Sequence, residues 1–600
     1  MSLLNVWVAK AWQRVTGKGG TGGGQNPATG SARLCGLFLP CMLLVGCDPG
    51  TPYRDSEPVF TASGAAAPLS DSEFRRLSPE QQYLVANKLS ASFYRGVPVD
   101  EFFDLSAGMN RLQPRDSRYL SNTAQALRTP LQPARRQELR DRIGLNPDDT
   151  PVYSADDLFE FAGIGNENTT HLHKQLPLAQ ITAFPLSRDL FVEWMAYFLA
   201  NTIMFSPALE MESTDSKDAG FVYNYLRNSI RDQVPVRDIV RQYLGTQSRW
   251  RVSRSAENHA LEAYELFLGL FDTEEDSRRG GTACQDWRLS PESAQYQLVR
   301  SGEPNRTYQR VLDRYYILDC SDLYNVIVSH PLFMPRVTEV IVNYFLPELD
   351  VERRLAFVQA VVAANPTTFE DIFSAVIFSR EYLLNSERPM WFEENMFGSL
   401  HRLRWSLERN QGDIGRRILR RLQEPSGASL SQHAMGSAAM EYKIGRTPFV
   451  PMDTLSFSSQ AKAMREQVYI VNRNGWLGGE YSSGTRGFRG LLFDAVPRED
   501  NPELMRTVLR PELEAMDAAA FIDYLFLSSL MRRADPDERA ALIAMMRTDD
   551  GSAGLDYIRL IDGELRVRPN SINFYRDITQ VVFEYVTRLP EFYYVRRVGS

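Results

Sequence analysis

Apolar residues recur at helical spacing, three or four positions apart, through most of the chain from residue 83 onward. Such periodicity gives a helix one apolar face that packs into a core. The predicted helices span residues 83–94, 186–202, 221–244, 256–271, 323–345, 351–363, 368–384, 392–407, 518–531, 536–546 and 572–594. Residues 467–472 and 555–567 are the best strand or hairpin candidates. The pattern predicts a mainly α protein, a multi-helix globular body with few short strands.

Two local sequences carry the signal for the start of a helix. In both Ser78-Pro79 and Ser290-Pro291, a serine precedes a proline, and a glutamate follows. Serine favours the N-cap position, and proline is tolerated at the first helical position. We therefore expect a helix to begin at each of these two prolines.

Length and composition indicate several packed units. Six hundred residues exceed the usual ~100 to 200 residues of one domain. Hydrophobic residues make up 43% and charged residues 24%, which is a globular composition. The predicted division is a signal peptide at 1–46, a flexible tether at 47–71, a main helical domain at 72–411, a long loop or junction at 412–464 and a C-terminal mainly helical domain at 465–600.

The N-terminal region contains a short apolar run, Leu34–Gly46, which follows four basic residues and is interrupted by Pro40. It is too short for a membrane span, which needs about 20 apolar residues, and suits a secretory segment of about 7 to 15. The run ends in Leu-Val-Gly followed by Cys47. This ending resembles the lipobox of bacterial lipoproteins, whose cysteine is acylated and becomes the new N-terminus. The resemblance implies lipidation at Cys47 and a location in the bacterial cell envelope, facing the periplasm or the cell surface, with the membrane as partner.

The net charge argues against nucleic acid as a partner. The formal net charge is -8, and it becomes about -12 if residues 1–46 are removed. Binding to a phosphate backbone needs a basic face. The strongest basic cluster, within residues 416–421, is more typical of a solvated helix face than of a nucleic-acid site. We therefore expect an envelope protein as the partner.

Three cysteines, Cys47, Cys284 and Cys320, follow the predicted cleavage site. An oxidising compartment makes Cys284 and Cys320 candidates for one disulfide, although two free buried thiols would give the same pattern. The chain has no Cys-x-x-Cys spacing, which argues against a zinc ribbon or a thioredoxin-like pair.

The segment "ENHALEAYELFLG", residues 257–269, concentrates polar side chains in an apolar helix. At helical spacing, Asn258, Glu262 and Glu265 share one face. Glu262 and Glu265 are candidates for a general acid and base, and Asn258 for binding. Alternatively, the carboxylates accept hydrogen bonds from arginine, as buried carboxylates must. We favour this structural interpretation.

The same segment carries a resemblance to a known family. Its Glu-Asn-x-Ala-x-Glu-x-x-Glu-Leu-x-Leu-Gly pattern is followed by Thr-Glu-Glu-Asp at 273–276. With the order of elements over about residues 187–407, this resembles the secreted bacterial family called domain of unknown function eighteen hundred. The family's Trp-His-Asn-His-Phe segment corresponds at best to residues 194–198, where both histidines are absent. The family has no settled activity, so the resemblance implies no reaction.

Two further sets of side chains are candidate sites. His171 and His173 could share a metal with Glu167 on an extended segment, but a further ligand at diagnostic spacing is missing. Trp476 and Tyr481 could stack on a sugar or clamp a partner, although buried aromatic anchors are more common in loops. The sequence has no Gly-x-Ser-x-Gly or His-Glu-x-x-His motif, and no cofactor is predicted.

These observations favour a non-catalytic binding or scaffolding role in an extracytoplasmic assembly. The alternative is a hydrolase or metal-dependent enzyme that acts on envelope glycan through Glu262 and Glu265. An open site that gathers these residues would favour the enzyme, whereas burial against arginine would favour the scaffold.

Overall fold

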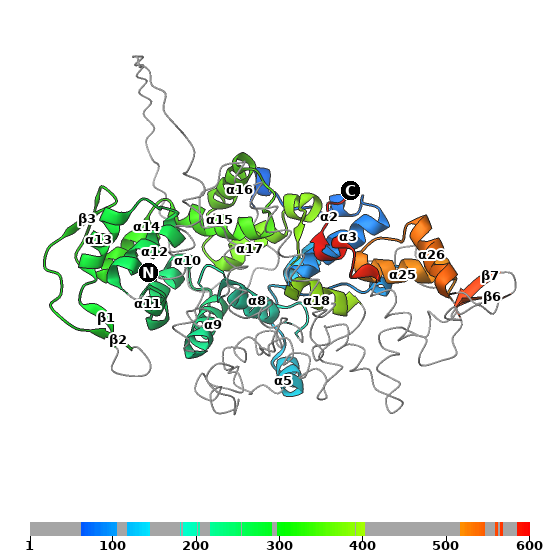
Figure 1. Ribbon diagram of the computed structural model, residues 1–600, viewed down its shortest axis with the longest axis horizontal. Coiled ribbons are helices and arrows are strands. Elements are labelled where there is room, and N and C mark those ends of the chain that lie inside the picture. Colours follow the sequence, from blue (N-terminus) through cyan, green and yellow to red (C-terminus); the bar gives the residue numbers. More distant parts are fainter. Residues whose placement is uncertain are drawn as a thin grey trace, which may run out of the picture. The chain divides into compact units, whose positions relative to one another are not determined.

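A computed structural model describes most of the chain between residues 62 and 599 (Figure 1). The described residues are 62–104, 117–143, 181, 184–200, 202–204, 216–253, 255–290, 297–390, 392–402, 516–546, 558–561, 564–567 and 585–599. All of them belong to one compact unit, Pro58–Ser600. The predicted lipidation site Cys47, the metal candidates Glu167, His171 and His173, and the binding candidates Trp476 and Tyr481 lie outside the described residues.

Helices make up 63% of the described part of the chain, which confirms the mainly α prediction. The N-terminal α-helices are α2 (Asp71–Phe74), α3 (Pro79–Ala91), α4 (Tyr119–Ala126), α5 (Pro133–Ile143), α8 (Arg188–Ala200), α9 (Ser216–Arg231), α10 (Val236–Leu244), α11 (Gln247–Ser253), α12 (Ala256–Leu268) and α13 (Glu274–Ala283). The later ones are α14 (Cys320–Ser329), α15 (Phe333–Phe345), α16 (Val351–Ala363), α17 (Phe369–Ile377), α18 (Phe392–Arg402), α25 (Ala518–Leu530) and α26 (Pro536–Met546).

Short elements complete the described structure. The 3₁₀-helices are η1 (Gly64–Ala66), η2 (Val99–Glu101) and η6 (Pro590–Tyr593), and η4 (Glu381–Asn385) is a π-helix. The strands are β1 (Trp287–Ser290), β2 (Gln297–Arg300), β3 (Gln309–Val311), β4 (Tyr315–Ile317), β5 (Arg388–Pro389), β6 (Ile558–Ile561), β7 (Glu564–Val567) and β8 (Tyr594–Val595). They form four antiparallel pairs, β1 with β2, β3 with β4, β5 with β8 and β6 with β7. No described helix is long and apolar enough to span a bilayer.

Prolines divide two of the predicted helices. The segment 221–244 forms α9 and α10, and α10 begins after Pro235. The segment 323–345 forms α14 and α15, which are separated at His330 and Pro331. Proline removes a backbone donor and disfavours helical backbone in the residue before it. The apolar stripe therefore continues across each break while the helix does not.

The structure describes one of the two predicted helix starts. Ser78 forms a reciprocal capping box with Gln81 at the start of α3, which confirms the first prediction. The second predicted start, Pro291, lies outside the described residues, and Ser290 before it ends β1 as the register partner of Gln297 in β2.

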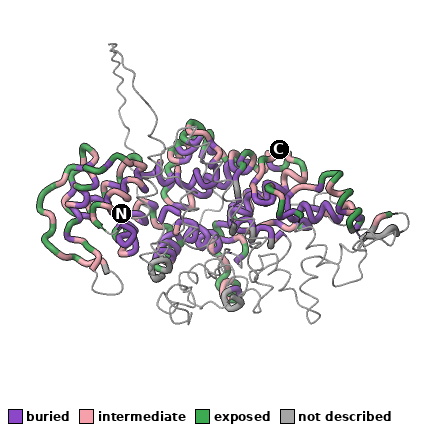
Figure 2. Tube along the Cα trace, viewed as in Figure 1, coloured by how far each residue is buried: buried purple, intermediate pink, exposed green. Residues whose placement is uncertain are grey.

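Aromatic side chains fill the core where α8, α15 and α17 meet, and Figure 2 shows these helices largely buried. The Trp194 ring lies edge-on to Phe373 at a centroid distance of 5.1 Å. Phe198 stacks on Phe345 at 5.9 Å and meets Phe373 edge-on at 5.1 Å. These are the offset and edge-to-face arrangements that the ring quadrupole favours. Residues 194–198, where the resemblance expected histidines, thus supply core packing.

The C-terminal helices and strand share this core rather than forming a separate one. Helix α18 packs against both α3 and α25, which are far apart in the sequence (Figure 1). The Arg402 Nε atom donates to the Ser528 carbonyl at 2.7 Å, and Asn395 Nδ2 donates to the Phe592 carbonyl at 2.7 Å. Described residues of the predicted domains 72–411 and 465–600 therefore pack as one body.

Part of the predicted tether also packs on this body. The Leu69 amide donates to the Phe378 carbonyl at 3.0 Å, and the Arg380 amide donates to the Ala67 carbonyl at 2.9 Å. Ala62, Ala66 and Leu69 are buried. Backbone hydrogen bonds and apolar burial thus fix residues 62–71, which the sequence assigns to the flexible tether 47–71.

Helices α12 and α13 approach closely through two glycines. A Cβ atom at Gly281 would lie 2.8 Å from the Glu257 Cα atom, and one at Gly280 would lie 2.7 Å from the Ala260 Cβ atom. A side chain at either glycine would therefore push α13 away from the helix that carries Glu262 and Glu265.

We predict that Gly281→Ala lowers the free energy of unfolding by about 1–3 kcal/mol, because the added methyl group overpacks this contact. Denaturant unfolding measures the change. Thr282→Ala, the next position on α13, is the matched control and should change the free energy by less than ~1 kcal/mol. Equal effects of the two substitutions would contradict the close approach.

Candidate functional site

The predicted polar segment forms α12, and its ends follow from the sequence. The Ser255 side chain caps the N-terminus by accepting from the Asn258 amide. Gly269 ends the helix with a φ of 70°, a left-handed conformation that glycine adopts without strain. Between these residues, one face of α12 is buried against neighbouring helices, and Glu262 and Glu265 are partly exposed.

Glu262 is neutralised by an arginine from α11. The Arg249 Nη1 atom lies 2.9 Å from Glu262 Oε2, and the Asn258 Nδ2 atom donates to Glu262 Oε1 at 2.8 Å. Arg249 is 1% exposed and Glu262 14%. Both carboxylate oxygens therefore have donors, in the arrangement that the structural interpretation expected.

Glu265 lies on the same face but has no ion-pair partner among the residues that the structure describes. Burial raises the pKa of Glu265 to about 7, and the nearby Glu262 carboxylate adds to this effect. Arg249 opposes it. In the predicted pair, Glu262 thus accepts hydrogen bonds from Arg249 and Asn258, whereas the Glu265 carboxyl has a pKa close to neutral pH. A general acid and its partner carboxylate would differ in their surroundings in this way.

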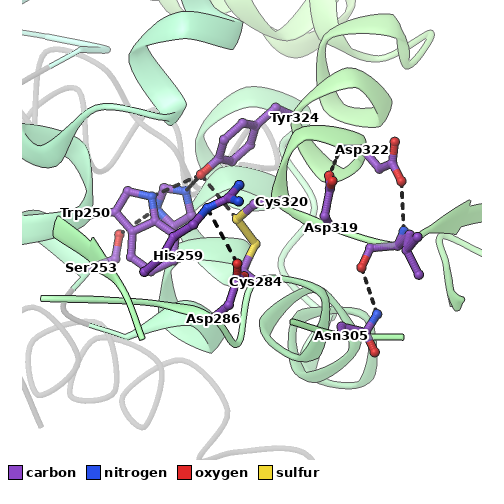
Figure 3. The surroundings of a disulfide bond; sticks show 12 residues. Trp250, Ser253, His259, Cys284, Asp286, Asn305, Asp319, Cys320, Asp322 and Tyr324 are labelled. Carbon is purple, nitrogen blue, oxygen red and sulfur yellow. Dashed lines mark hydrogen bonds and ion pairs between the residues drawn. A yellow bond between two sulfur atoms is a disulfide. The ribbon is translucent and has the colours of Figure 1, made fainter. Parts of the chain in front are cut away.

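His259, from the same helix, belongs to a closed network that the sequence analysis missed (Figure 3). Its ring stacks on Trp250 at a centroid distance of 4.4 Å. His259 Nε2 lies 3.0 Å from the Tyr324 hydroxyl, which also accepts a hydrogen bond from Trp250 Nε1 at 3.0 Å. His259 Nδ1 lies 3.3 Å from Ser253 Oγ. Aromatic and hydroxyl groups from α11 and α14 thus enclose the imidazole of α12.

One assignment of hydrogens satisfies every member of this network. Tyr324 donates to His259 Nε2, and His259 donates from Nδ1 to Ser253, whose hydroxyl donates to the Arg249 carbonyl at 3.3 Å. Burial lowers the pKa of His259 well below its ordinary value, and the positive charge of Arg249 lowers it further. His259 is therefore neutral and serves as a fixed packing and hydrogen-bonding group.

A disulfide joins Cys284 to Cys320 next to this network. The two Cα atoms are 4.7 Å apart, and both side chains are buried. Cys284 follows the last residue of α13, and Cys320 is the first residue of α14. The bond thus closes the base of residues 285–319, which contain β1 to β4 and are called the arm below.

A second buried charged cluster surrounds β5, and no sequence motif indicated it. Arg388 makes a bidentate pair with Glu394 at 2.7 and 2.8 Å, and both side chains are 1% exposed. Burial alone would lower the pKa of Arg388, but the Glu394 carboxylate raises it well above its ordinary value. The guanidinium also lies over the rings of Tyr344, Phe345 and Tyr382.

Lys88 and Glu348 complete this cluster. Lys88 Nζ donates to the Ser386 carbonyl at 3.0 Å, and Glu348 Oε1 accepts from the Glu387 amide at 3.1 Å. Burial lowers the pKa of Lys88 to about 7 and raises that of Glu348 to about 7. Lys88 and Glu348 thus both form hydrogen bonds to the backbone of residues 386–387, which is a structural role.

No group of three or more metal-binding side chains occurs in the described part of the chain. The candidate chemistry of α12 rests on Glu262, Glu265 and Asn258. Of the predicted site residues, the structure brings together these three and the two cysteines. The proximity of Arg249 to α12 could have been suspected from the sequence, since only a short connection separates the two helices.

Comparison with protein-family models, curated proteins and solved structures finds no match to this chain. The resemblance of residues 187–407 to the secreted bacterial family therefore stays a prediction. The site is interpreted from its own geometry.

We predict that Glu265→Gln stabilises the protein at pH 8 by ~1–2 kcal/mol, after allowance for partial solvent screening. The folded protein keeps a proton on Glu265 that the unfolded chain loses above pH 4.5, so its free energy of unfolding should fall as pH rises from 4.5 through about 7. Glu265→Gln should flatten this fall. Urea unfolding from pH 5 to 8 measures this pH dependence of the free energy of unfolding. Glu257→Gln, at an exposed position on the same helix, is the control.

Arg388→Ala should lower the free energy of unfolding by about 3–5 kcal/mol, because it leaves Glu394 buried without its partner. Arg353→Ala, which breaks an exposed pair with Glu381, is the control and should cost at most ~1 kcal/mol. The double variant Arg388→Met with Glu394→Leu removes both charges and should recover much of the loss. A double variant as unstable as Arg388→Ala would contradict the unpaired charge as the cause.

Proposed function

We propose that this protein is a lipid-anchored component of the bacterial cell envelope with a non-catalytic binding or scaffolding role in an extracytoplasmic assembly. The Cys284–Cys320 disulfide is the observation that carries the proposal. Disulfides form and persist in oxidising compartments and are rare in the cytosol. This supports the lipobox-like ending at Cys47, which by itself implies the same location.

The state of Glu262 supports a role without catalysis. Arg249 and Asn258 occupy both of its carboxylate oxygens, and His259 beside it is buried and neutral. An active general base needs a free oxygen directed at its substrate. The side chains of α12 instead connect α11, α12 and α14 into one packed unit.

A hydrolase acting on envelope glycan is the second candidate, and the raised pKa of Glu265 favours it. A glycosidase needs one carboxylic acid that is protonated near neutral pH beside an ionised carboxylate. The Glu265→Gln variant separates the two functions. Loss of glycan turnover in a Glu265→Gln variant that still folds would support the hydrolase, whereas unchanged binding and no turnover in either protein would support the scaffold.

We predict that the chain incorporates labelled palmitate when it is expressed in a bacterial host, and that Cys47→Ala abolishes the incorporation. Cys284→Ser is the control and should retain the label, since it removes a cysteine that is buried in the folded body. Mass mapping of the same membrane extract without reductant should find the peptides of Cys284 and Cys320 joined. Full-length unacylated protein in the cytoplasm, with both thiols free, would refute the proposed location.

A further inference from the structure

The arm presents two of the most exposed large apolar side chains in the described structure. Tyr308 is 66% exposed and Tyr316 is 64% exposed. Figure 2 shows this part of the chain, next to β3 in Figure 1, as largely exposed. An exposed aromatic ring costs solvation free energy, and clusters of such rings on a surface are typical of binding sites.

An arginine of β3 lies close to both tyrosines, opposite Tyr316 and two residues after Tyr308, which directly precedes the strand. Arg310 in β3 is the register partner of Tyr316 in β4, and Tyr308 precedes Arg310 by two residues. Side chains two residues apart in extended chain point to the same side. On the opposite side, Val311 and Ile317 are buried against the helices. Tyr308, Arg310 and Tyr316 are called the outer face of the arm.

Arg310 has hydrogen-bond donors that it does not use within the described structure. Its Nε atom donates to the Asp313 carbonyl, and in the described part of the chain its two Nη groups make no hydrogen bond. A planar guanidinium with free donors suits a carboxylate, which it can bind through two parallel hydrogen bonds.

The charge close to the outer face favours an anionic ligand. Residues 300–317 contain four arginines and two carboxylates, whereas the whole arm, residues 285–319, contains five of each and the whole chain has a formal net charge of -8. The segment that carries the outer face is therefore locally basic, and it would attract an acidic partner.

The size of the outer face favours a glycan over a folded protein. A strand of three residues is only ~10 Å long, and neighbouring strands lie ~4.8 Å apart. Three exposed side chains supply on the order of 300 Å². A stable protein interface needs about 800 Å² from each partner. A few sugar rings, whose apolar faces stack on tyrosine, need no more than this surface offers.

Three contacts hold the outer face in place. The disulfide closes the base of the arm, and the Leu312 amide at the hairpin turn donates to Asp276 Oδ1 of α13 at 2.9 Å. The Arg279 Nη1 atom donates to the Arg310 carbonyl at 2.8 Å. The face is thus ordered before any ligand arrives, which lowers the entropic cost of binding.

We propose that Tyr308, Arg310 and Tyr316 bind a carboxylated glycan of the cell envelope. The tyrosine rings stack on the sugar faces, and the Arg310 guanidinium pairs with the carboxylate. This deepens the proposed binding role and rests on it, because an envelope location brings such glycans within reach.

Binding of tetragalacturonate to the detergent-solubilised full chain, measured by calorimetry, tests the proposal. The neutral chitotetraose should bind at least ~10-fold more weakly, since it lacks the carboxylate. Arg310→Gln and the double variant Tyr308→Ala with Tyr316→Ala should each weaken tetragalacturonate at least ~10-fold. Arg310→Lys should be intermediate, because it keeps the charge and loses the planar fork.

Matched variants at other exposed positions distinguish binding at this site from a general effect of losing one charge or one aromatic ring. Arg353→Gln removes one positive charge at another exposed position, and Phe221→Ala removes another exposed ring; both should leave binding unchanged. Circular dichroism and melting should be the same for all variants, since the three side chains are exposed.

Three outcomes would overturn the assignment. These are absence of tetragalacturonate binding, an equal effect of Arg353→Gln and Arg310→Gln, and poly-glutamate binding as tightly as tetragalacturonate. The last outcome would assign the face to an acidic protein segment. Failure here is distinguishable from failure of the envelope role, because palmitate labelling at Cys47 does not depend on the arm.

Discussion

A guanidinium taken out of water stays charged, so it must keep a carboxylate or carbonyl groups within reach of its donors. This requirement governs where segments that are distant in the sequence meet. Arg388 joins Glu394 inside a cage of aromatic rings, and Arg402 donates to the Ser528 carbonyl across the contact of α18 with α25. Arg249 joins α11 to α12 through Glu262. A packing that separated these partners would leave a buried charge unpaired, which helps to select one arrangement.

The helical body could be predicted from the sequence because its signal is long and repeated. Helices such as α16 and α26 have the predicted bounds, since an apolar stripe of three turns is difficult to mistake. The strands β1 to β4 were missed because each has only three or four residues and half of them are polar. Their pairing depends on contacts across the arm and on the disulfide at its base. The hydrophobic periodicity of the sequence indicates neither of these.

The candidate site was predictable in part. Helical geometry places Asn258, Glu262 and Glu265 on one face, and the expectation of an arginine partner is met at Glu262. The difference between the two glutamates follows from the position of Arg249, which only packing decides. Lys88 and Glu348 are 260 positions apart, so no local pattern could bring them together.

The pairing of Arg388 with Val595 in β5 and β8 has a kinetic consequence. Contacts between residues so far apart in the chain form slowly, because a long loop must close first. Along the chain, α3 and α18 come long before β8, the strand that covers β5, so they are the first to leave the ribosome and, on the proposed route of export, the translocation channel. The chain must therefore wait with part of its aromatic core uncovered, and a chaperone that shields this surface would act in that interval.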